Sequence, residues 1–291
     1  MRLGIIMINR VCAIIITYNV KENIINVVNA IKGQVSEVLL VDNGSDKSTL
    51  EILSDLKNTN NNVSLILNNK NLGIAKAINK GIKFATKKDF NWILTLDHDT
   101  ICEKDMIKKM FNVFNICNEK NSVAMISPRV FETTKKNYIT KKNNGMFNYV
   151  RECIQSGSLI KISTIHKIGL FNEDLFIYHV DFEFCERIIN AGMKILQCNN
   201  TTIYHEEGYK IPKNILGRKI FYNNYSCLAI YYITRNTIYM SKKYNIFYSK
   251  RILKDFIHIS LFDKDRNNKL KYLFYGIKDA FNNKYGKFED M

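Results

Sequence analysis

The chain has 291 residues, 46% of them hydrophobic, and a formal net charge of +16, which fits a globular protein with one large α/β domain and an appendage, or with two modest domains. Its seven cysteines are scattered without a Cys-x-x-Cys pair, which argues against a disulfide framework and a zinc site and favours a reducing compartment. No stretch reaches the roughly 18 apolar residues of a membrane span, and no small-residue cleavage site follows the first apolar run, so we expect a cytoplasmic protein without a signal peptide.

Strand-like and helix-like segments alternate four times in the first half of the chain. Runs rich in Val, Ile and Leu predict strands over residues 11–16, 38–41, 63–67, 92–96 and 123–126. Helical segments lie between them, the first ending near residue 31 and the next two covering residues 48–56 and 74–85. This alternation predicts an α/β fold with a mostly parallel central sheet wrapped by helices.

Polar residues directly follow three of the predicted strands. They are Thr17, Tyr18 and Asn19 after the first, Asp42 after the second, and Asp97 and Asp99 after the fourth. In such sheets, ligands bind beyond the carboxyl ends of the strands. We therefore expect these three clusters, which come from different strands, to converge on one cleft.

Asp97 and Asp99 follow a buried strand with one residue between them. In an extended segment their side chains would lie on the same side, roughly 6.6 Å apart along it, while His98 would point the other way. Two ionised carboxylates this close repel each other unless a cation or strong donors lie between them. Oxygen ligands without a cysteine suit a hard divalent ion, so the pair predicts a Mg²⁺ or Mn²⁺ site, although a lone Asp-x-Asp also occurs in ordinary loops.

Two further carboxylates each allow two interpretations. Asp42 is either a turn residue that caps the next helix or an acceptor for the base or ribose of a nucleotide. Asp181 lies in the first turn of a helix predicted over residues 181–190, where the helix dipole and backbone donors stabilise the anion. That is an ordinary capping role; alternatively, Asp181 takes the proton of an attacking hydroxyl as a general base.

The second half of the chain is less regular. Short strands are expected over residues 157–160, 194–198 and 202–204, and a helical turn over residues 163–168. From about Lys210 the pattern becomes helical, tyrosine-rich and basic, with 17 Lys and Arg against 6 Asp and Glu. This region would attract a polyanion, either nucleic acid or an anionic membrane face, or it is a solvated surface.

Five segments occur in the order and approximate spacing seen in glycosyltransferase family 2. They are IIITYNV, VDNGSDKST, NKNLGIAKAINKGI, LDHDT and GLFNEDLFIYHVDFEFCERIINAGMKI. The chain particularly resembles the bacterial rhamnosyltransferase branch at LDHDT and LFIYHVDFE. The resemblance spans about residues 11–207 and implies a GT-A fold, in which a nucleotide-binding sheet continues into an acceptor-binding half.

The resemblance also implies a division of the chain. Residues 1–209 would form the GT-A catalytic domain, with the nucleotide-sugar half over about residues 1–130 and the acceptor half over about residues 131–209. Residues 210–291 would form a basic, aromatic-rich helical C-terminal region.

Functional residues are assigned by the same resemblance. In the family, the residue that matches Asp42 contacts the pyrimidine, and the pair that matches Asp97 and Asp99 handles ribose and metal, with the second carboxylate as the direct metal ligand. His205, in IYHEEG, resembles a family histidine that touches the metal or the diphosphate, although a lone histidine is more often structural. The residues expected to bind the nucleotide sugar are Thr17, Tyr18, Asn19, Asp42, Asn71, Gly73, Asn79 and Asp97.

The family residue that matches Asp181 is the catalytic base, and Glu183 is a neighbour that could substitute for it or bind acceptor hydroxyls. These roles imply an inverting, metal-dependent transfer of a sugar from a nucleoside diphosphate. Rhamnose from dTDP-rhamnose is the expected donor, and a cell-surface polysaccharide or a lipid-linked glycan at the cytoplasmic membrane face is the expected acceptor. The basic C-terminal region would then hold the enzyme at anionic lipid.

Three departures from the family pattern affect these expectations. The Gln-x-x-Arg-Trp motif and the membrane spans of processive synthases do not occur in this sequence, which favours single addition. His98 stands where the rhamnosyltransferases often have Gln, so a UDP-linked galactose, glucose or N-acetylhexosamine is the alternative donor. The segment YYITRN (residues 231–236) resembles one in the rhamnosyltransferase branch, and it either binds acceptor or diphosphate or packs a helix on the core.

Two other functional classes fit less well. A sugar-phosphate nucleotidyltransferase would need a Gly-rich, basic loop after the first strand to hold a triphosphate, where this chain has TYNVKENI. A basic nucleic-acid-binding protein would fit the charge but leaves the acidic strand ends unexplained, so we expect no nucleic-acid partner. The oligomeric state is not indicated.

Overall fold

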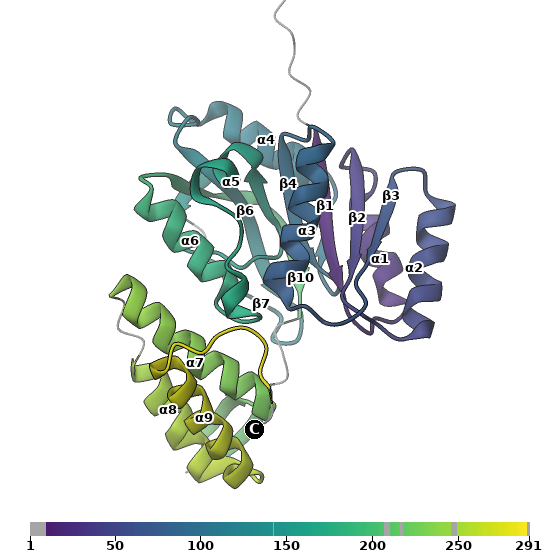
Figure 1. The fold of residues 1–291 in the computed structure, drawn as a ribbon. Coiled ribbons are helices and arrows are strands. Elements are labelled where there is room, and N and C mark those ends of the chain that lie inside the picture. Colours follow the sequence, from purple (N-terminus) through teal and green to yellow (C-terminus); the bar gives the residue numbers. More distant parts are fainter. Residues whose placement is uncertain (1–9, 142, 207–209, 216–217, 246–248, 290–291) are drawn as a thin grey trace, which may run out of the picture. The chain divides into compact units, whose positions relative to one another are not determined.

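The computed structural model describes residues 10–141, 143–206, 210–215, 218–245 and 249–289 (Figure 1). The chain divides into two compact units. The sheet unit comprises Met1–Phe171 and Phe184–Glu206, and the C-terminal unit comprises Asn172–Glu183 and Glu207–Met291. The boundary expected at residue 209 lies outside the described residues. The division also groups Asn172–Glu183 with the C-terminal helices, which the sequence did not suggest.

The sheet unit contains a mixed sheet in the order β3-β2-β1-β4-β9-β6-β10-β5. Strands β3, β2, β1 and β4 are all parallel, whereas β9 runs antiparallel to β4 and β6. The predicted α/β class is therefore confirmed, with the parallel pattern in the first half of the chain. The strands are β1 (Val11–Thr17), β2 (Glu37–Asp42), β3 (Val63–Leu67), β4 (Trp92–Asp97), β5 (Ile101–Cys102), β6 (Val123–Glu132), β7 (Asn137–Tyr138), β8 (Phe147–Val150), β9 (Ser158–Lys161) and β10 (Lys194–His205).

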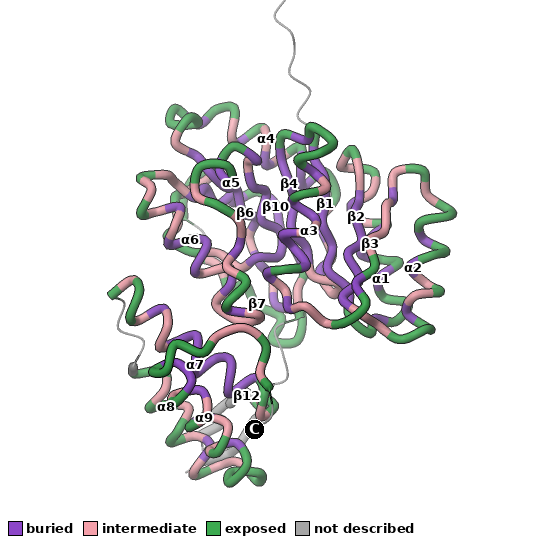
Figure 2. Tube along the Cα trace, viewed as in Figure 1, coloured by how far each residue is buried: buried purple, intermediate pink, exposed green. Residues whose placement is uncertain are grey.

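Helices pack on both faces of this sheet, which is why its central strand β1 is buried along its whole length (Figure 2). Residues of α1 and α4 share one core cluster with Ala13 and Ile15 of β1, while α3 packs on the opposite face, where Ile14 points. A Cβ atom on Gly81 of α3 would lie 2.5 Å from Cγ2 of Ile14, so only glycine allows this close approach. The helices are α1 (Asn23–Ile31), α2 (Lys47–Thr59), α3 (Ile74–Lys87), α4 (Met106–Ile116), α5 (Ile162–Ile168) and α6 (Val180–Asn190).

The C-terminal unit corrects one expectation. The chain was expected to be helical from about Lys210, but β11 (Lys210–Ile215) and β12 (Arg218–Asn223) form an antiparallel hairpin. Isoleucine occurs in both segments, and Phe221 and Tyr222 occur in the second; these residue types favour strands over helix. Helices follow as α7 (Cys227–Tyr244), α8 (Ser249–Phe262) and α9 (Arg266–Phe281). Among the described helices, none has the length and apolar character needed to cross a membrane.

Candidate active site

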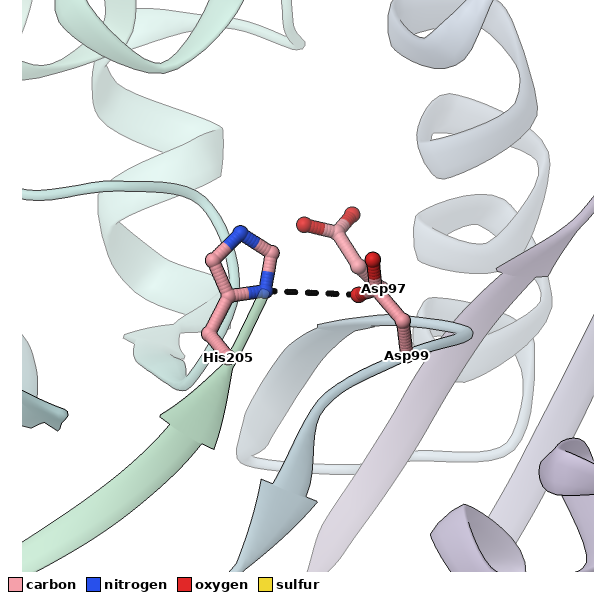
Figure 3. A group of neighbouring side chains, drawn as sticks. All are labelled: Asp97, Asp99 and His205. Atoms are coloured by element: carbon pink, nitrogen blue, oxygen red, sulfur yellow. Dashed lines mark ion pairs between the residues drawn. The ribbon is translucent and has the colours of Figure 1, made fainter. Parts of the chain in front are cut away.

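Three potential metal ligands come together where β4 and β10 end (Figure 3). Asp97 is the last residue of β4, Asp99 lies in the turn that follows, and His205 is the last residue of β10. One ligand atom from each residue lies within 4.8 Å of the other two, and all three residues are partly buried. Carboxylate and imidazole groups are common ligands of divalent ions, so this group could hold one.

The two carboxylates approach each other through a turn, not along an extended strand as the sequence suggested. The backbone N–H of Thr100 donates to the carbonyl oxygen of Asp97 (3.3 Å). The strand therefore ends at Asp97, and the chain folds back so that Asp99 faces the same space. The predicted pairing of these residues holds, although the extended geometry used to predict it does not.

Two buried hydroxyl groups hold this turn and the histidine. Oγ of Ser156 accepts a hydrogen bond from the backbone N–H of Asp97 (2.9 Å) and donates to Oγ1 of Thr100 (2.7 Å). Oγ1 of Thr100 in turn lies 2.9 Å from Nδ1 of His205. Thr100 was visible in LDHDT, but Ser156 was missed because no local pattern connects it to this turn.

The surroundings of Asp99 favour its ionised form. Burial by itself raises the pKa of this carboxyl group, but the hydrogen bond with His205 and the charges of His205 and His98 outweigh it, and the pKa lies below the usual value. Nδ1 of His205 lies 3.3 Å from Oδ1 of Asp99. The carboxylate is thus held in the charged state that a metal ligand requires.

The ends of β1 and β2 lie beside this group, as the sequence predicted. In the sheet, Thr17 pairs with Asp42, and Ile16 pairs with Asp97. Oγ1 of Thr17 donates to Oδ1 of Asp42 (3.1 Å), and Tyr18, the next residue, is 45% exposed. The expected convergence of strand ends is therefore observed for these residues.

Asp42 organises the loop that follows it. Its carboxylate accepts hydrogen bonds from the hydroxyl of Thr17, the hydroxyl of Ser45, and the backbone N–H groups of Gly44 and Ser45. These four bonds match the acceptor capacity of one carboxylate. The cap of α2 is instead Asp46, which accepts from the backbone N–H of Thr49 (2.9 Å), so the capping interpretation of Asp42 is wrong.

A second loop packs against the first through asparagine side chains. Nδ2 of Asn43 donates to Oδ1 of Asn71 (3.0 Å), which also accepts from the backbone N–H of Gly73 (2.9 Å). On the β1 side, the backbone N–H of Asn19 donates to Oγ of Ser45 (2.8 Å). Asn19, Asn71 and Gly73 thus belong to the same edge as Asp42, where a nucleotide was expected.

Asn79 has a different place. Its side chain is buried in α3, donates to the carbonyl oxygen of Phe171 (2.9 Å) and accepts from the backbone N–H of Phe171 (3.0 Å). Both ends of the amide are therefore used to hold Phe171. This geometry argues against the expected contact between Asn79 and a nucleotide sugar.

Asp181 and Glu183 both lie in the first turn of α6, in the segment that belongs to the C-terminal unit. Asp181 is partly exposed and accepts from the backbone N–H of Phe182 (2.9 Å). Glu183 is fully buried, and its carboxylate is bound by Nζ of Lys243 (3.0 Å) and the hydroxyl of Tyr244 (2.7 Å). Glu183 is therefore an anchor in this structure, which argues against its use as a base or as an acceptor ligand.

The sequence of this chain is similar to those of known glycosyltransferases. Residues 12–181 match the model of glycosyl transferase family 2. The dTDP-rhamnosyl transferase RfbF of Shigella flexneri is 28% identical over 284 residues, which cover 91% of this chain and 92% of that protein. The low-salt glycan biosynthesis hexosyltransferase Agl10 of Haloferax volcanii is 24% identical over 220 residues, 69% of this chain and 68% of that protein.

A solved structure shares the fold. The crystal structure of GalNAc-T7 with UDP, GalNAc and Mn²⁺ superimposes with a TM-score of 0.59 at 13% identity. The match covers 94% of this chain and 57% of that one, and at this identity it concerns the fold alone, which is GT-A. The family match extends over more than half of the sequence and includes the strand ends that carry Thr17, Asp42, Asp97 and Asp99. The chain therefore belongs to glycosyl transferase family 2 and is a glycosyltransferase.

Proposed function

We propose that this protein is an inverting, metal-dependent glycosyltransferase that uses a nucleoside-diphosphate sugar. The Asp97–Asp99–His205 group carries the proposal because it lies at the strand ends next to Thr17 and Asp42. A nucleotide lying along the loops of Thr17–Asn19, Asp42–Ser45 and Asn71–Gly73 would bring its diphosphate to this group. Asp42 then shapes the base pocket through its loop, and the exposed ring of Tyr18 is available to stack on the base.

The ligand types at this site fit a divalent cation. Two carboxylates and one imidazole combine the oxygen ligands that Mg²⁺ and Mn²⁺ accept with a nitrogen ligand that suits transition ions, so Mn²⁺ fits better than Mg²⁺. A cation held by Asp97, Asp99 and His205 would supply positive charge where the departing diphosphate becomes more negative.

The proposed donor is dTDP-rhamnose. The similarity to a dTDP-rhamnosyl transferase extends over 91% of the chain, so it includes the C-terminal unit as well as the sheet. The alternative is a UDP-linked galactose, glucose or N-acetylhexosamine, because His98 stands where rhamnosyltransferases often have Gln. The proposed acceptor is a sugar hydroxyl of a cell-surface polysaccharide or of a lipid-linked glycan.

Asp181 is the proposed base. The acceptor hydroxyl attacks the anomeric carbon of the donor sugar while Asp181 takes the hydroxyl proton. The bond between that carbon and the diphosphate oxygen breaks, and its electron pair stays on the diphosphate. A single displacement of this kind inverts the anomeric configuration and needs no covalent enzyme intermediate.

Helix α8 offers a surface for a membrane. Its large apolar side chains Leu253, Phe256, Ile257 and Leu261 are exposed at helical spacing, with Leu253 61% and Leu261 66% exposed. Exposed Lys250 and Lys254 belong to the same helix. An apolar stripe accompanied by lysines is typical of helices that lie in the interface of an anionic bilayer. We therefore propose that the enzyme works at the cytoplasmic face of the membrane, resting on it through α8.

Calorimetry tests the donor and the metal together. We expect dTDP to bind in the presence of Mn²⁺ and much more weakly without it, and UDP and GDP to bind less tightly than dTDP. Tighter binding of UDP would favour the alternative donors. Binding that does not depend on a divalent ion, or no binding of any of the three nucleotides, would contradict the proposed function.

A further inference from the structure

The segment that precedes Asp181 has an unusual backbone. Phe176, Tyr178 and His179 have φ angles of 62°, 63° and 59°, in the left-handed region that non-glycine residues rarely adopt. Three such residues among four positions do not persist unless the surrounding structure holds them. The conformation of this segment determines where α6 begins, and therefore the position of Asp181 in its first turn.

Two buried side chains of α7, Arg235 and Asn236, hold this segment. Nη2 of Arg235 donates to the carbonyl oxygens of Asp174 (3.1 Å) and Leu175 (3.0 Å). Nδ2 of Asn236 lies within 2.9 Å of the carbonyl oxygens of Leu175, Ile177 and Tyr178. The carbonyl groups of the strained segment are thus bound by two neighbouring residues of one helix.

Arg235 also orients Asn236. Nε of Arg235 donates to Oδ1 of Asn236 (3.0 Å), which directs the amide nitrogen of Asn236 toward the carbonyl oxygens. A lysine could not do this, because its ammonium group lacks the planar fork of donors. The two residues therefore act as one unit, here called the Arg235–Asn236 clamp.

The burial of Arg235 is costly, which points to a specific use. The residue is fully buried, and among the described residues no carboxylate forms an ion pair with it. Its hydrogen bonds go to carbonyl and amide oxygens, including the carbonyl oxygen of Gly286 (2.7 Å), and the ring of Tyr232 lies 5.0 Å from its Cζ atom. A buried charge without a counter-ion is expensive, and here its hydrogen bonds go to the backbone of the segment.

Helix α7 also binds the segment at other points. Thr237 Oγ1 lies 3.1 Å from Nε2 of His179, and the hydroxyl of Tyr239 accepts from Nδ2 of Asn172 (2.8 Å). Beyond Asp181, Lys243 and Tyr244 bind the buried carboxylate of Glu183. Contacts from one helix therefore flank Asp181 on both sides in the sequence.

We infer that Arg235 and Asn236 are positioning residues for the transfer reaction, which hold the segment Asp174–Tyr178 so that Asp181 is presented in a fixed place. This inference rests on the proposed role of Asp181 as the base. It also gives a role to YYITRN, whose last two residues bind the chain's own backbone.

Kinetics of Asn236→Ala test the inference. We expect the kcat of transfer to fall roughly 10- to 100-fold, since a shift of about 1 Å in a reacting group can cost this much. The KM for the donor should not change, because the proposed nucleotide loops belong to the sheet unit. Lys242→Ala is the matched control: it removes a hydrogen bond from α7 to the carbonyl oxygen of Ala280 (2.9 Å), and we expect it to leave kcat unchanged.

A double-mutant cycle separates positioning from a general loss of folded protein. If Asn236 acts through Asp181, then Asp181→Asn will cost much less activity in the Asn236→Ala background than in the natural protein. Equal losses in both backgrounds, or an unchanged kcat in Asn236→Ala, would overturn the inference. Arg235→Lys provides a second variant with the same expected result, should Asn236→Ala not fold.

Hydrogen exchange gives a readout that does not need activity. We expect the backbone amides of residues 175–181 to exchange faster in Asn236→Ala and in Arg235→Lys than in the natural protein. In the control Lys242→Ala, these amides should exchange at the natural rate. Unchanged exchange in this segment would overturn the clamp. If no donor is turned over but the exchange result holds, the proposed function fails and the clamp stands as a purely structural device.

Discussion

His205 and Asp99 meet at 3.3 Å between Nδ1 and Oδ1, although they lie far apart in the sequence. His205 closes the long strand β10, and Asp99 lies in the turn after β4. The ligand group is therefore complete only when β10 has taken its place in the sheet. A metal ion would bind the folded chain and not the unfolded chain, so it should also stabilise the fold.

Replacing Asp99 should remove the metal dependence. In Asp99→Asn we expect Mn²⁺-dependent binding of dTDP to weaken at least about 100-fold, since loss of residues that only support metal ligands already costs 10- to 100-fold. Transfer should be lost with it. Calorimetry and a transfer assay measure the two effects. Asp89→Asn is the control, because it removes an exposed carboxylate from a turn with a positive φ that Asn tolerates. Mn²⁺-dependent turnover by Asp99→Asn would contradict the assignment of Asp99 as a metal ligand.

Replacing Asp181 should separate binding from chemistry. In Asp181→Asn we expect donor affinity to be retained and kcat to fall by about 10²- to 10⁴-fold, the usual contribution of a general base. Calorimetry gives the first quantity and steady-state kinetics the second. Asp174→Asn, an exposed acid of the same segment, should behave as the natural protein. Undiminished transfer by Asp181→Asn would exclude it as the base.

His179 should make the protein sensitive to mild acid. Burial, together with the positive charge of Arg251, lowers the pKa of His179 to about 4, whereas the unfolded chain binds this proton with a pKa of about 6.5. Between these values the unfolded state binds more protons, so the free energy of unfolding falls as the pH falls from about 6.5 to about 4, by at most about 1.4 kcal/mol per pH unit.

The variant His179→Asn isolates this effect. Asn does not titrate in this range and tolerates the φ of 59° at this position. Urea unfolding at several pH values should show a steeper loss of stability in the natural protein than in the variant between pH 6.5 and 4. Parallel curves for the two proteins would show that His179 is not responsible.

The α8 surface predicts binding to anionic lipid. We expect the natural protein to sediment with vesicles that contain phosphatidylglycerol, less so at high salt, and not with pure phosphatidylcholine. The double variant Leu253→Glu with Leu261→Glu should lose this binding. Ile116→Glu, which places the same charge at an exposed position of the sheet unit, should retain it.

Two results would count against this assignment of α8. The first is a natural protein that does not sediment with anionic vesicles. The second is a dimer, detected by light scattering, that the α8 variant dissociates, since a second copy of the chain would then cover the apolar stripe.

Much of the sheet unit could be predicted because its signals are local. The run from Val11 to Ile16 is apolar at every position, and all seven residues of β1 are buried, as a strand covered on both faces requires. The polar residues after each run mark where the strands end. Parallel strands in register then bring Thr17, Asp42 and Asp97 to one edge.

Other residues have partners that lie far away in the sequence and that no local pattern indicates. Asn79, expected to bind the nucleotide sugar, pairs with Phe171. Glu183, expected as a substitute base or a ligand of acceptor hydroxyls, is bound by Lys243 and Tyr244. The helical region expected from about Lys210 begins with a hairpin, whose two strands hydrogen-bond to each other, and its helices follow from Cys227. In each case the local sequence allows both outcomes.

Apolar runs and short motifs in the sequence were enough to indicate the family, the α/β class, and the strand ends that carry the acidic residues. The sequence did not show that Asp99 reaches Asp97 through a turn, that Ser156 holds this turn, or that Arg235 and Asn236 bind the segment before Asp181. These arrangements form because buried polar groups must find hydrogen-bonding partners. Those partners are chosen by three-dimensional packing between residues that lie far apart in the chain.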